Sequence, residues 1–429
     1  MTFTAPPAFT TRPTLTGTFG MAASTHWLAT ASAQAVLERG GNAFDAAVAG
    51  GFVLHVVEPH LNGPGGDLVG IFATASDPGT AVVLVGQGPA PGGATIEHYR
   101  GQGLDLVPGA GGLAAAVPGS VDAWLTLLHD HGTWELADVL AYAIGYARDG
   151  HPLLPQARAT IARVARLFSD HWPSSAALWM PEGRVPEAGT MLRNPAYAGV
   201  LESLVAAGHV VRDDGPVGRE ARIDAARREW KTGTVAQAAV AFLSSPHRHS
   251  DGRDHAAVIG VDDFAGFDAS YEPAVTTEFR GHTVAKASAW TQGPALLQAL
   301  RILDGHPDID PSTELGAHAV LEALKLALAD RDAYYGDAKV PLEVLLSDEY
   351  AASRRAQIGQ TASHEWRPGA VPGREPFRPP LRSAGADATD GVGEPTREPP
   401  GAPPHTPDSL TPAPGRTRGD TCHIDIVDR

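Results

Sequence analysis

The feature that most limits how this chain can fold is a proline-rich tract close to its C-terminal end. Between Trp366 and Arg418 lie 13 of the chain's 36 prolines, together with Gly, Ser, Thr, Arg and Asp and few large apolar residues. A segment of this composition buries too little apolar surface to offset the entropy lost on folding. We therefore expect a mobile linker over residues 361–420, and a folded body over residues 17–360 behind an N-terminal tail of residues 1–16.

A short strand is predicted directly after this tract. Residues 423–427 alternate apolar and polar side chains, which is typical of a half-buried strand, and the sequence then stops at Arg429. An isolated strand can neither satisfy its backbone groups nor bury a face. We expect either that this strand pairs with strands from earlier in the chain or, more simply, that the sequence is cut short.

Composition and charge exclude several classes of partner. The chain has 429 residues, 43% of them hydrophobic, which suffices for one large globular domain. Its formal net charge is -16 and no basic stretch is interleaved with aromatics, so neither nucleic acid nor an anionic membrane is expected as a partner. The single cysteine, Cys422, excludes an internal disulfide and a cysteine metal site. No signal peptide or apolar run of membrane-spanning length is recognisable, so we expect a cytoplasmic protein.

Hydrophobic periodicity predicts a helix-helix-strand-strand unit in the first part of the chain. The helices are expected over 28–39 and 43–54, with Gly40-Gly41 as a left-handed turn and Asn42 as a cap. Two antiparallel strands are expected over 68–74 and 81–85. Further helices are predicted over 120–132, 134–150, 293–303 and 313–336, and further strands over 256–261 and 273–279. In the last helix Leu321, Leu324 and Leu328 recur at helical spacing, so we expect them to face the core.

Several short segments together resemble one protein family. Their order and rough spacing along nearly the whole chain are similar to those of the large subunit of the γ-glutamyltransferase family. The segments are Gly20-Met21 through Ser24-Thr-His26, Gly40-Gly-Asn-Ala-Phe-Asp-Ala-Ala-Val48, Val57-Glu-Pro-His60, Gly63-Pro-Gly-Gly66, Val117-Pro-Gly119, Ala147-Arg-Asp-Gly150, Leu192-Arg193 with Pro195, Ala295-Leu-Leu-Gln-Ala-Leu300 and Leu345-Leu-Ser-Asp348.

The resemblance implies an α+β fold, a four-layer αββα sandwich of the N-terminal nucleophile hydrolase type, here incomplete at its C-terminus. It also implies a precursor that cuts itself and leaves a threonine at the start of a small subunit. Asp420-Thr421-Cys422-His423 is similar to that junction. Residues 17–360 would then be the large subunit, residues 361–420 the linker up to the processing site, and residues 421–429 the start of the small subunit.

The implied chemistry needs a hydroxyl and an amine on one residue. A threonine hydroxyl is a weak nucleophile until a base takes its proton, and a free α-amine with a pKa of about 7.7 to 8 can do so near neutral pH. That amine exists only after the bond between Asp420 and Thr421 is broken. The Thr421 hydroxyl must therefore first attack the Asp420 carbonyl, and in the mature enzyme it would attack an amide and pass the acyl group to water or to an amine. The family supplies the oxyanion donors from the small subunit.

One departure from the family bears on the substrate. The family holds the α-carboxylate of a γ-glutamyl group with an arginine in an Arg-Glu-x-Ala-Pro segment, where this chain has Gln87-Gly-Pro-Ala-Pro91. Gln87, which would then contact the substrate, is neutral and cannot form a charge-assisted bidentate pair with a carboxylate. Three readings stay open: a γ-glutamyltransferase or glutathione hydrolase, a related amidase or acylase acting on other small amides, and an inactive large-subunit fragment that needs its own small subunit as partner.

Two other possibilities are weighed and set aside. Cys422, beside the nucleophile, is expected to act as a small hydrophobe and not as a reactive thiol. Neither His55, Glu58 and His60 nor the loop carrying His247, His249, Asp251, Asp254 and His255 is expected to bind a metal, and the loop is expected to be a solvated surface segment. No metal and no cofactor are expected.

Overall fold

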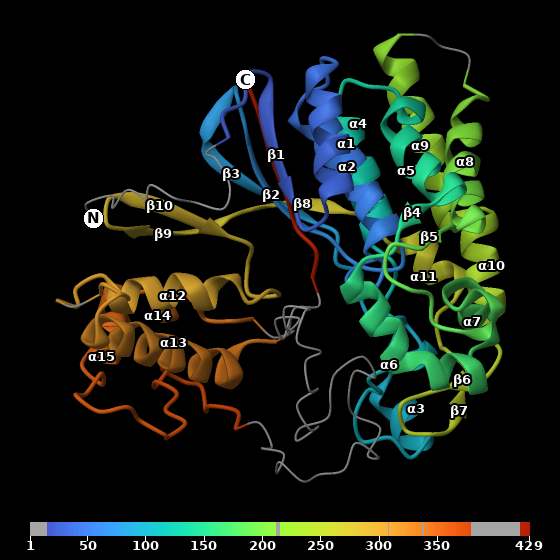
Figure 1. Cartoon of the computed structure of the whole chain (residues 1–429). Helices are drawn as coiled ribbons and strands as arrows, with labels where there is room; N and C mark the ends of the chain where they lie inside the picture. The colour runs from blue at the N-terminus through green and yellow to red at the C-terminus, as the bar shows by residue number, and fades with distance from the viewer. Residues whose placement is uncertain (1–14, 212–214, 308, 337–338, 379–420) are drawn as a thin grey trace. The chain divides into compact units, whose positions relative to one another are not determined.

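The computed structural model describes residues 15–211, 215–307, 309–336, 339–378 and 421–429 (Figure 1). Contacts between Cα atoms divide the chain into two compact units. The first comprises Met1–Leu68, Gly86–Ala269 and Asp387–Arg429, and the second comprises Val69–Val85 and Ser270–Ala386. The domain boundaries predicted from the sequence stay a prediction, as does the processing site. In the described part of the chain, none of the helices combines the length and the apolar character that crossing a bilayer requires.

The first unit is built around helix α2 (Ala43–Val57), which packs against α1 (Trp27–Glu38), α4 (Ser120–His131) and α5 (Leu136–Asp149). The predicted turn after α1 and the predicted cap at the start of α2 are both confirmed. Gly40 takes a φ of +91° after α1, a conformation that favours glycine. Asn42 caps α2 by accepting hydrogen bonds from the Phe44 and Asp45 N–H groups, and the Asp45 carboxylate accepts one from the Asn42 N–H in return.

A two-stranded antiparallel sheet lies beside these helices (Figure 1, blue and red). It joins β1 (Gly20–Ser24) to β11 (Ile424–Asp428), with Gly20 opposite Asp428 and Ser24 opposite Ile424. The predicted strand after the proline-rich tract therefore exists, and it pairs with a strand from the other end of the chain. Residues 379–420 of the predicted linker lie outside the described residues.

The remaining elements of the first unit are mainly helices. They are α3 (Ile96–Gly101), β4 (His151–Pro152), α6 (Pro155–His171), α7 (Pro173–Trp179), β5 (Met191–Leu192), α8 (Pro195–Gly208), α9 (Pro216–Thr232), α10 (Thr234–Leu243), β6 (His247–Arg248), β7 (Asp254–His255) and α11 (Val261–Gly266), with short 3₁₀ turns at Gly112–Ala114 and Pro181–Gly183. Strands β4 and β5 pair antiparallel, as do β6 and β7.

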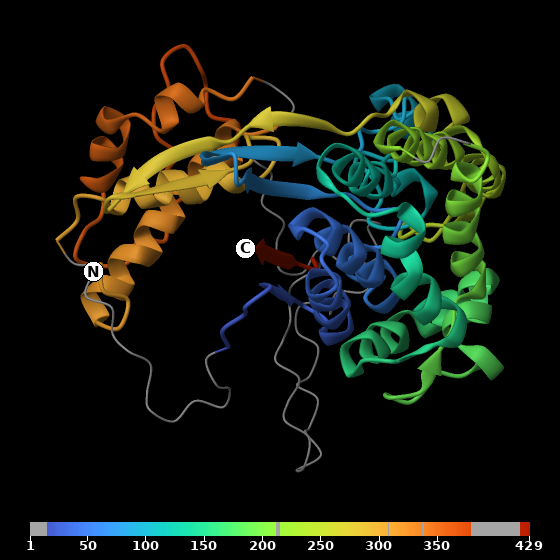
Figure 2. The ribbon, with the colours of Figure 1, turned by 90° about the horizontal axis from the view of Figure 1, so that it is seen from above.

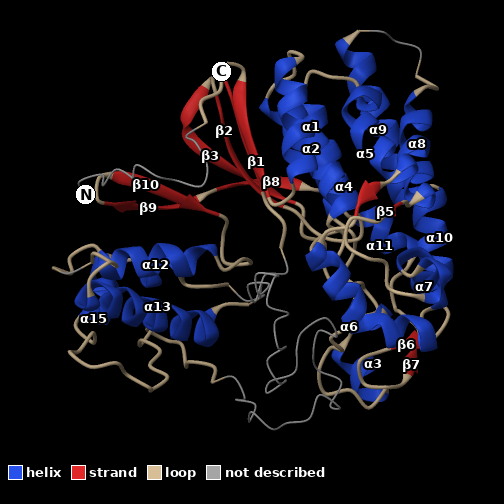
Figure 3. Ribbon diagram, viewed as in Figure 1, coloured by secondary structure: helices blue, strands red, loops and turns tan. Residues whose placement is uncertain are grey.

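The second unit contains a three-stranded antiparallel sheet in the order β2 (Val69–Thr74), β3 (Asp77–Val85) and β8 (Ser270–Pro273) (Figure 2, blue and yellow strands). The predicted antiparallel pairing of β2 with β3 is confirmed. A hairpin of β9 (Val275–Phe279) and β10 (His282–Lys286) packs on α12 (Gly293–Leu303), which packs in turn on α13 (Glu314–Tyr334) (Figure 3). Helices α14 (Leu342–Leu345) and α15 (Asp348–Arg355) complete the unit.

Two predicted features of the packing are wrong. Residues 256–260 form no strand: they run as an irregular segment into α11, with the Ala257 N–H bonded to the Leu243 carbonyl. In α13 Leu321 and Leu328 do not face the core, since they are 61% and 40% exposed, and Leu324 is half-buried. The buried face carries mostly small residues, together with Leu326, Tyr334 and the two acids Glu322 and Asp330. Periodicity of the larger residues misled the prediction because a close helix contact favours alanine.

The described start of the predicted linker packs against α13. The Gly369 N–H bonds to a carboxylate oxygen of Asp330 at 2.6 Å, and the Phe377 N–H bonds to the Ala333 carbonyl at 3.1 Å. Arg367 pairs with the buried carboxylate of Glu322 at 2.7 Å. Buried carboxylates on the helix require partners, and Gly369 and Arg367 supply them. Together with the backbone hydrogen bond of Phe377, these contacts hold residues up to at least Phe377 to the second unit.

Asp45 gives a first test of this packing. Its fully buried carboxylate accepts hydrogen bonds from the Asn42 N–H, the Thr133 N–H and hydroxyl and the Trp134 N–H, at 2.7 to 3.0 Å. Asp45→Ala leaves those donors unpaired, so we expect a loss on the order of 3 kcal/mol in the free energy of unfolding. Asp45→Asn should lose less, and the exposed Asp105→Ala about 0.5 kcal/mol or less. Urea unfolding measures all three, and an equal loss in Asp45→Ala and Asp105→Ala would contradict the assignment.

Buried histidines give a second test. Burial lowers the pKa of His26 to about 4, of His55 to about 3 and of His60 to about 4. Unfolded histidines take up protons below about pH 6.5, so the unfolded state binds more protons than the folded state between about pH 6.5 and about pH 4. The free energy of unfolding should therefore fall as the pH is lowered through this window. Replacing one of them, as in His60→Asn, should reduce the slope by up to about 1.4 kcal/mol per pH unit.

Chemical denaturation at several pH values measures this slope. A midpoint that stays constant or rises between pH 7 and pH 5 would show that these side chains are not held neutral by the fold.

Candidate functional site

Thr421 lies three residues ahead of β11 and is exposed. Along the segment that follows, exposed and half-buried side chains alternate, so Thr421, His423, Asp425 and Val427 share the outer face. Asp420 lies outside the described residues, so the predicted cleavage site is described only on its Thr421 side. An exposed threonine just ahead of a paired strand can be reached by a reacting group.

Thr25 extends the pairing of β1 with β11 beyond its last strand pair. The Thr25 N–H donates to the His423 carbonyl at 3.1 Å, and the Thr25 hydroxyl oxygen accepts from the His423 N–H at 3.5 Å. The same hydroxyl donates its proton to Oε2 of Glu58 at 2.5 Å. Both backbone groups of His423 are thereby held by one residue, and that residue is held by a carboxyl group at the C-terminal end of α2.

Burial controls the electrostatics next to Thr421. Glu58 is only 4% exposed, and burial raises its pKa, an effect opposed by the Thr25 hydrogen bond. Burial, and then the negative charges of Glu58 and Asp67, raise the pKa of the Cys422 thiol to about 11. The thiol is protonated at neutral pH, whereas the thiolate is the nucleophilic form. Cys422 is thus disfavoured as a nucleophile, in agreement with the expectation from the sequence.

Gln87 is exposed and lies in a backbone segment that is fixed on both sides. Its neighbour Gly86 exchanges two hydrogen bonds with Leu68, at 2.8 and 3.1 Å. On the other side, Gly88 lies so close to Val117 that a Cβ atom would come within 1.7 Å of the Val117 carbonyl oxygen. Glycine is therefore required at position 88, and it allows Gln87 to project from a rigid segment.

The glycine turn that precedes this segment also caps a helix. The Gly66 N–H bonds to the Gly63 carbonyl at 2.9 Å, and the Gly66 carbonyl accepts from the N–H groups of Gly119 and Ser120 at the start of α4. Asp67, next in the chain, is one of the charges acting on Cys422. The turn, the Gln87 segment and the start of β11 thus all belong to the first unit. The role of Gln87 itself stays a prediction.

The loop considered as a metal site, residues 247–255, contains two buried histidines that take part in hydrogen bonds. His249 is 2% exposed, accepts from the Leu113 N–H through Nε2 and donates through Nδ1 to the His247 carbonyl, each at 2.8 Å. His255 bonds to Asp251 at 2.8 Å. The expectation of a solvated loop holds for the tip at Gly252, Arg253 and Asp254, which is exposed, and is wrong for the rings of His249 and His255, which are buried. Among the described residues, no group of three or more His, Cys, Asp and Glu side chains could hold a metal ion.

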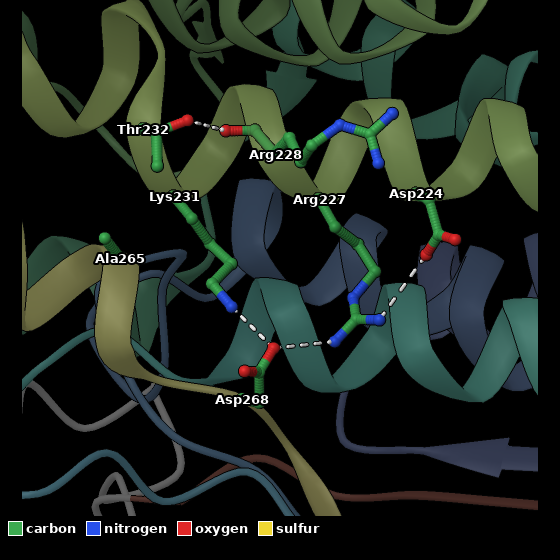
Figure 4. Close-up of a pocket in the computed structure, with 7 residues that line it drawn as sticks. All are labelled: Asp224, Arg227, Arg228, Lys231, Thr232, Ala265 and Asp268. Atoms are coloured by element: carbon green, nitrogen blue, oxygen red, sulfur yellow. Dashed lines mark hydrogen bonds and ion pairs between the residues drawn. The ribbon is translucent and has the colours of Figure 1, made fainter.

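A charged cavity of about 330 Å³ lies elsewhere in the first unit, along α9 (Figure 4). Its charges are paired with one another: Asp268 bonds to Lys231 at 2.5 Å and to Arg227 at 3.3 Å, and Arg227 also pairs with Asp224 and with the buried Asp122. Figure 4 shows Arg228 pointing away from Asp268. We interpret this cluster as an ion-pair network that fastens α9 to the segment before β8.

Sequence reasoning missed the contact between Thr25 and Glu58. Both residues lie in segments quoted for the family resemblance, Ser24-Thr-His26 and Val57-Glu-Pro-His60, but Glu58 was otherwise considered only as a metal ligand. The sequence signal that could have indicated this contact is that both residues belong to segments shared with the family. Their meeting at the start of β11 requires the pairing of strands 400 residues apart, which the spacing alone does not reveal.

Comparisons with known proteins agree with this architecture. The family model described as gamma-glutamyltranspeptidase matches residues 29–429. The chain is 31% identical to the glutathione hydrolase-like YwrD proenzyme of Bacillus subtilis strain 168, covering 81% of this chain and 61% of that protein. It is also 31% identical to the oxamate amidohydrolase proenzyme of Klebsiella pneumoniae, covering 83% of this chain and 63% of that protein. The chain thus spans about three fifths of the length of these relatives.

A solved structure, that of LmbA2991T421A, has the same fold over most of the chain. It superposes with a TM-score of 0.85 at 49% sequence identity and covers 98% of this chain and 67% of that one. The mixed arrangement of helices and antiparallel sheets and the match over residues 29–429 lead to one conclusion. The chain belongs to the γ-glutamyltransferase family, also called the gamma-glutamyltranspeptidase family.

Proposed function

We propose that this chain is a self-cleaving precursor of an N-terminal threonine hydrolase or acyl transferase that acts on a small amide. Thr421 is the nucleophile in this proposal, and cleavage occurs between Asp420 and Thr421. The observation that carries it is the exposed Thr421, three residues ahead of a strand that pairs with β1, in a chain of this family. The small subunit that starts at Thr421 is the expected partner.

Three further observations support the assignment of Thr421. The relatives from Bacillus subtilis and Klebsiella pneumoniae are both named proenzymes, which fits a precursor that is cleaved. The name LmbA2991T421A carries a threonine-to-alanine change with the same residue number as the threonine proposed here. The neighbouring side chain that could compete as a nucleophile, Cys422, has a pKa raised to about 11.

The first reaction is an acyl shift within the chain. The Thr421 hydroxyl oxygen attacks the carbonyl carbon of Asp420, the C–N bond between the two residues breaks, and the hydroxyl proton passes to the leaving nitrogen. The product is an ester in which the α-amine of Thr421 is already free, and water hydrolyses this ester to the α-carboxylate of Asp420 and the regenerated Thr421 hydroxyl. That amine then removes the proton from the same hydroxyl when an amide substrate binds, because its ordinary pKa lies near neutrality.

In this proposal Gln87 contacts the acyl group and determines the substrate class. A glutamine side chain offers neutral hydrogen bonds, whereas a free carboxylate is bound best by the planar, charged fork of arginine. We therefore favour amide or acyl donors without a γ-glutamyl α-carboxylate. The name of the oxamate amidohydrolase relative shows that the family includes amide hydrolases acting on other groups.

The four-layer αββα sandwich remains part of the proposal. The two described sheets that bear on it are β1–β11 in the first unit and β2–β3–β8 in the second, both antiparallel as such a sandwich requires. Helices α1 and α2 pack on the first sheet. A structure of the chain together with its small subunit would test the layering.

Thr421→Ala should abolish self-cleavage. Full-length wild-type protein should convert to two products whose masses place the break between Asp420 and Thr421, and Thr421→Ala should remain a single species. Cys422→Ala is the matched control and should cleave like the wild type, because its protonated thiol is not the attacking group. Mass spectrometry over a time course decides it, and a wild-type chain that stays intact when folded would contradict the proposal.

Gln87→Arg should shift the substrate preference towards γ-glutamyl donors. A charge-assisted pair with the donor carboxylate should improve kcat/KM on γ-glutamyl relative to simple amides on the order of tenfold, the size of one such hydrogen bond. Gln102→Arg adds the same charge at an exposed position outside this segment and should leave the ratio unchanged. The two substrates are compared side by side on processed protein assembled with its small subunit, and equal ratios in both variants would remove Gln87 from the site.

A further inference from the structure

Residues ahead of a paired strand fray unless their backbone groups are held. The pairing of β1 with β11 ends at Ser24 and Ile424, which leaves residues 421–423 ahead of the last strand pair. Once the chain is cut before Thr421, that segment becomes a free chain terminus, and termini without backbone partners are mobile. The nucleophile therefore requires an anchor beyond the sheet itself.

Thr25 supplies this anchor through both of its polar groups. Its N–H donates to the His423 carbonyl at 3.1 Å, and its hydroxyl oxygen accepts from the His423 N–H at 3.5 Å. A hydroxyl can serve as donor and acceptor at once, but its single proton goes to one partner. The direction of the hydrogen bonds at Thr25 therefore depends on what else accepts that proton.

Glu58 is that acceptor. Its Oε2 lies 2.5 Å from the Thr25 hydroxyl oxygen, and its side chain is 4% exposed at the C-terminal end of α2. A buried carboxyl group is costly unless it is hydrogen-bonded, so this contact is strongly favoured. With its proton committed to Glu58, the Thr25 hydroxyl presents its lone pairs to the His423 N–H.

We propose that Glu58 is a positioning residue for the nucleophile: acting through Thr25, it holds His423 and so fixes the backbone from which Thr421 projects. The inference rests on the proposed role of Thr421, but the anchoring of His423 ahead of β11 can be tested independently of that role. Glu58 touches no reacting atom in this account. Its contribution is to prevent fraying of the segment that carries the hydroxyl and, after cleavage, the amine.

Thr25→Val tests the relay with the least disturbance, because valine keeps the shape and the backbone N–H but removes the hydroxyl. We expect self-cleavage to slow by roughly threefold to tenfold, the effect of one hydrogen bond. Thr25→Ser should restore the rate, and Glu58→Gln, which retains an acceptor oxygen, should stay close to the wild type. Glu58→Ala should be as slow as Thr25→Val or slower.

Ser24→Ala is the matched control. The Ser24 hydroxyl, on the last residue of β1 and next to Thr25, bonds to the His26 carbonyl and to Thr30, each at 2.8 Å, and not to His423. Its loss should leave cleavage unchanged. Equal slowing in Ser24→Ala and Thr25→Val, or a wild-type rate in Thr25→Val, would overturn the inference.

Amide hydrogen exchange supplies a readout that does not depend on cleavage. In the uncleavable Thr421→Ala background, Thr25→Val should speed exchange of the His423 amide by a similar factor, while exchange in the middle of β11 and the thermal midpoint stay close to those of Thr421→Ala alone. If the wild type fails to cleave but this local change is seen, the proposed function fails and the positioning stands. If exchange at His423 is unchanged in Thr25→Val, the positioning fails even where cleavage by Thr421 is confirmed.

Discussion

The candidate site depends on the pairing of β1 with β11. These strands come from opposite ends of the chain, and closing so long a loop costs entropy that local contacts must offset. The offset comes from specific contacts of β11. The Asp428 carboxylate accepts a hydrogen bond from the Ala43 N–H at 2.8 Å, and Arg429 lies 5.1 Å from the centre of the Phe19 ring. Each contact holds the strand to the N-terminal part of the chain.

Helix α2 links both ends of β11. Its N-terminus is bonded to Asp428 at one end of the strand, and Glu58 at its C-terminus reaches His423 at the other through Thr25. From residue 43 to residue 58 a helix rises about 22 Å, and from 423 to 428 a strand extends about 17 Å. The two lengths are close enough for the side chains of Asp428 and Glu58 to bridge the remaining distance at the two ends. The helix therefore sets where the strand begins and ends, and with it the place of Thr421.

Local sequence signals predicted local structure well. The helix cap at Asn42, the glycine at position 40 and the hairpin of β2 and β3 were all predicted, because each depends on a few neighbouring residues. The identity of Thr421 as the candidate nucleophile also came from the sequence, through a family resemblance over nearly the whole chain. Its chemistry remains a prediction.

Features that depend on distant contacts could not be predicted in the same way. Leu321 and Leu328 of α13 were expected inside because their spacing is helical, but such spacing is equally compatible with exposed positions. The irregular segment 256–260 has strand-like residues and is held instead by a hydrogen bond from Ala257 to the end of α10. The relay from Glu58 to His423 joins three separate segments, and no single stretch of sequence contains it.

The register of β11 decides which side chains face solvent. Successive side chains of a strand point to opposite faces, so a slip by one residue would turn Thr421 inward and Cys422 outward. In so short a strand, the alternation of apolar and polar side chains alone specifies the register only weakly. Gly50 of α2 adds a steric constraint: a Cβ atom there would lie 2.3 Å from Cδ1 of Ile424, so this glycine makes room for that side chain. A slipped strand would lose this fit together with the Asp428 and Thr25 hydrogen bonds, and the native register is therefore specified at both ends of β11.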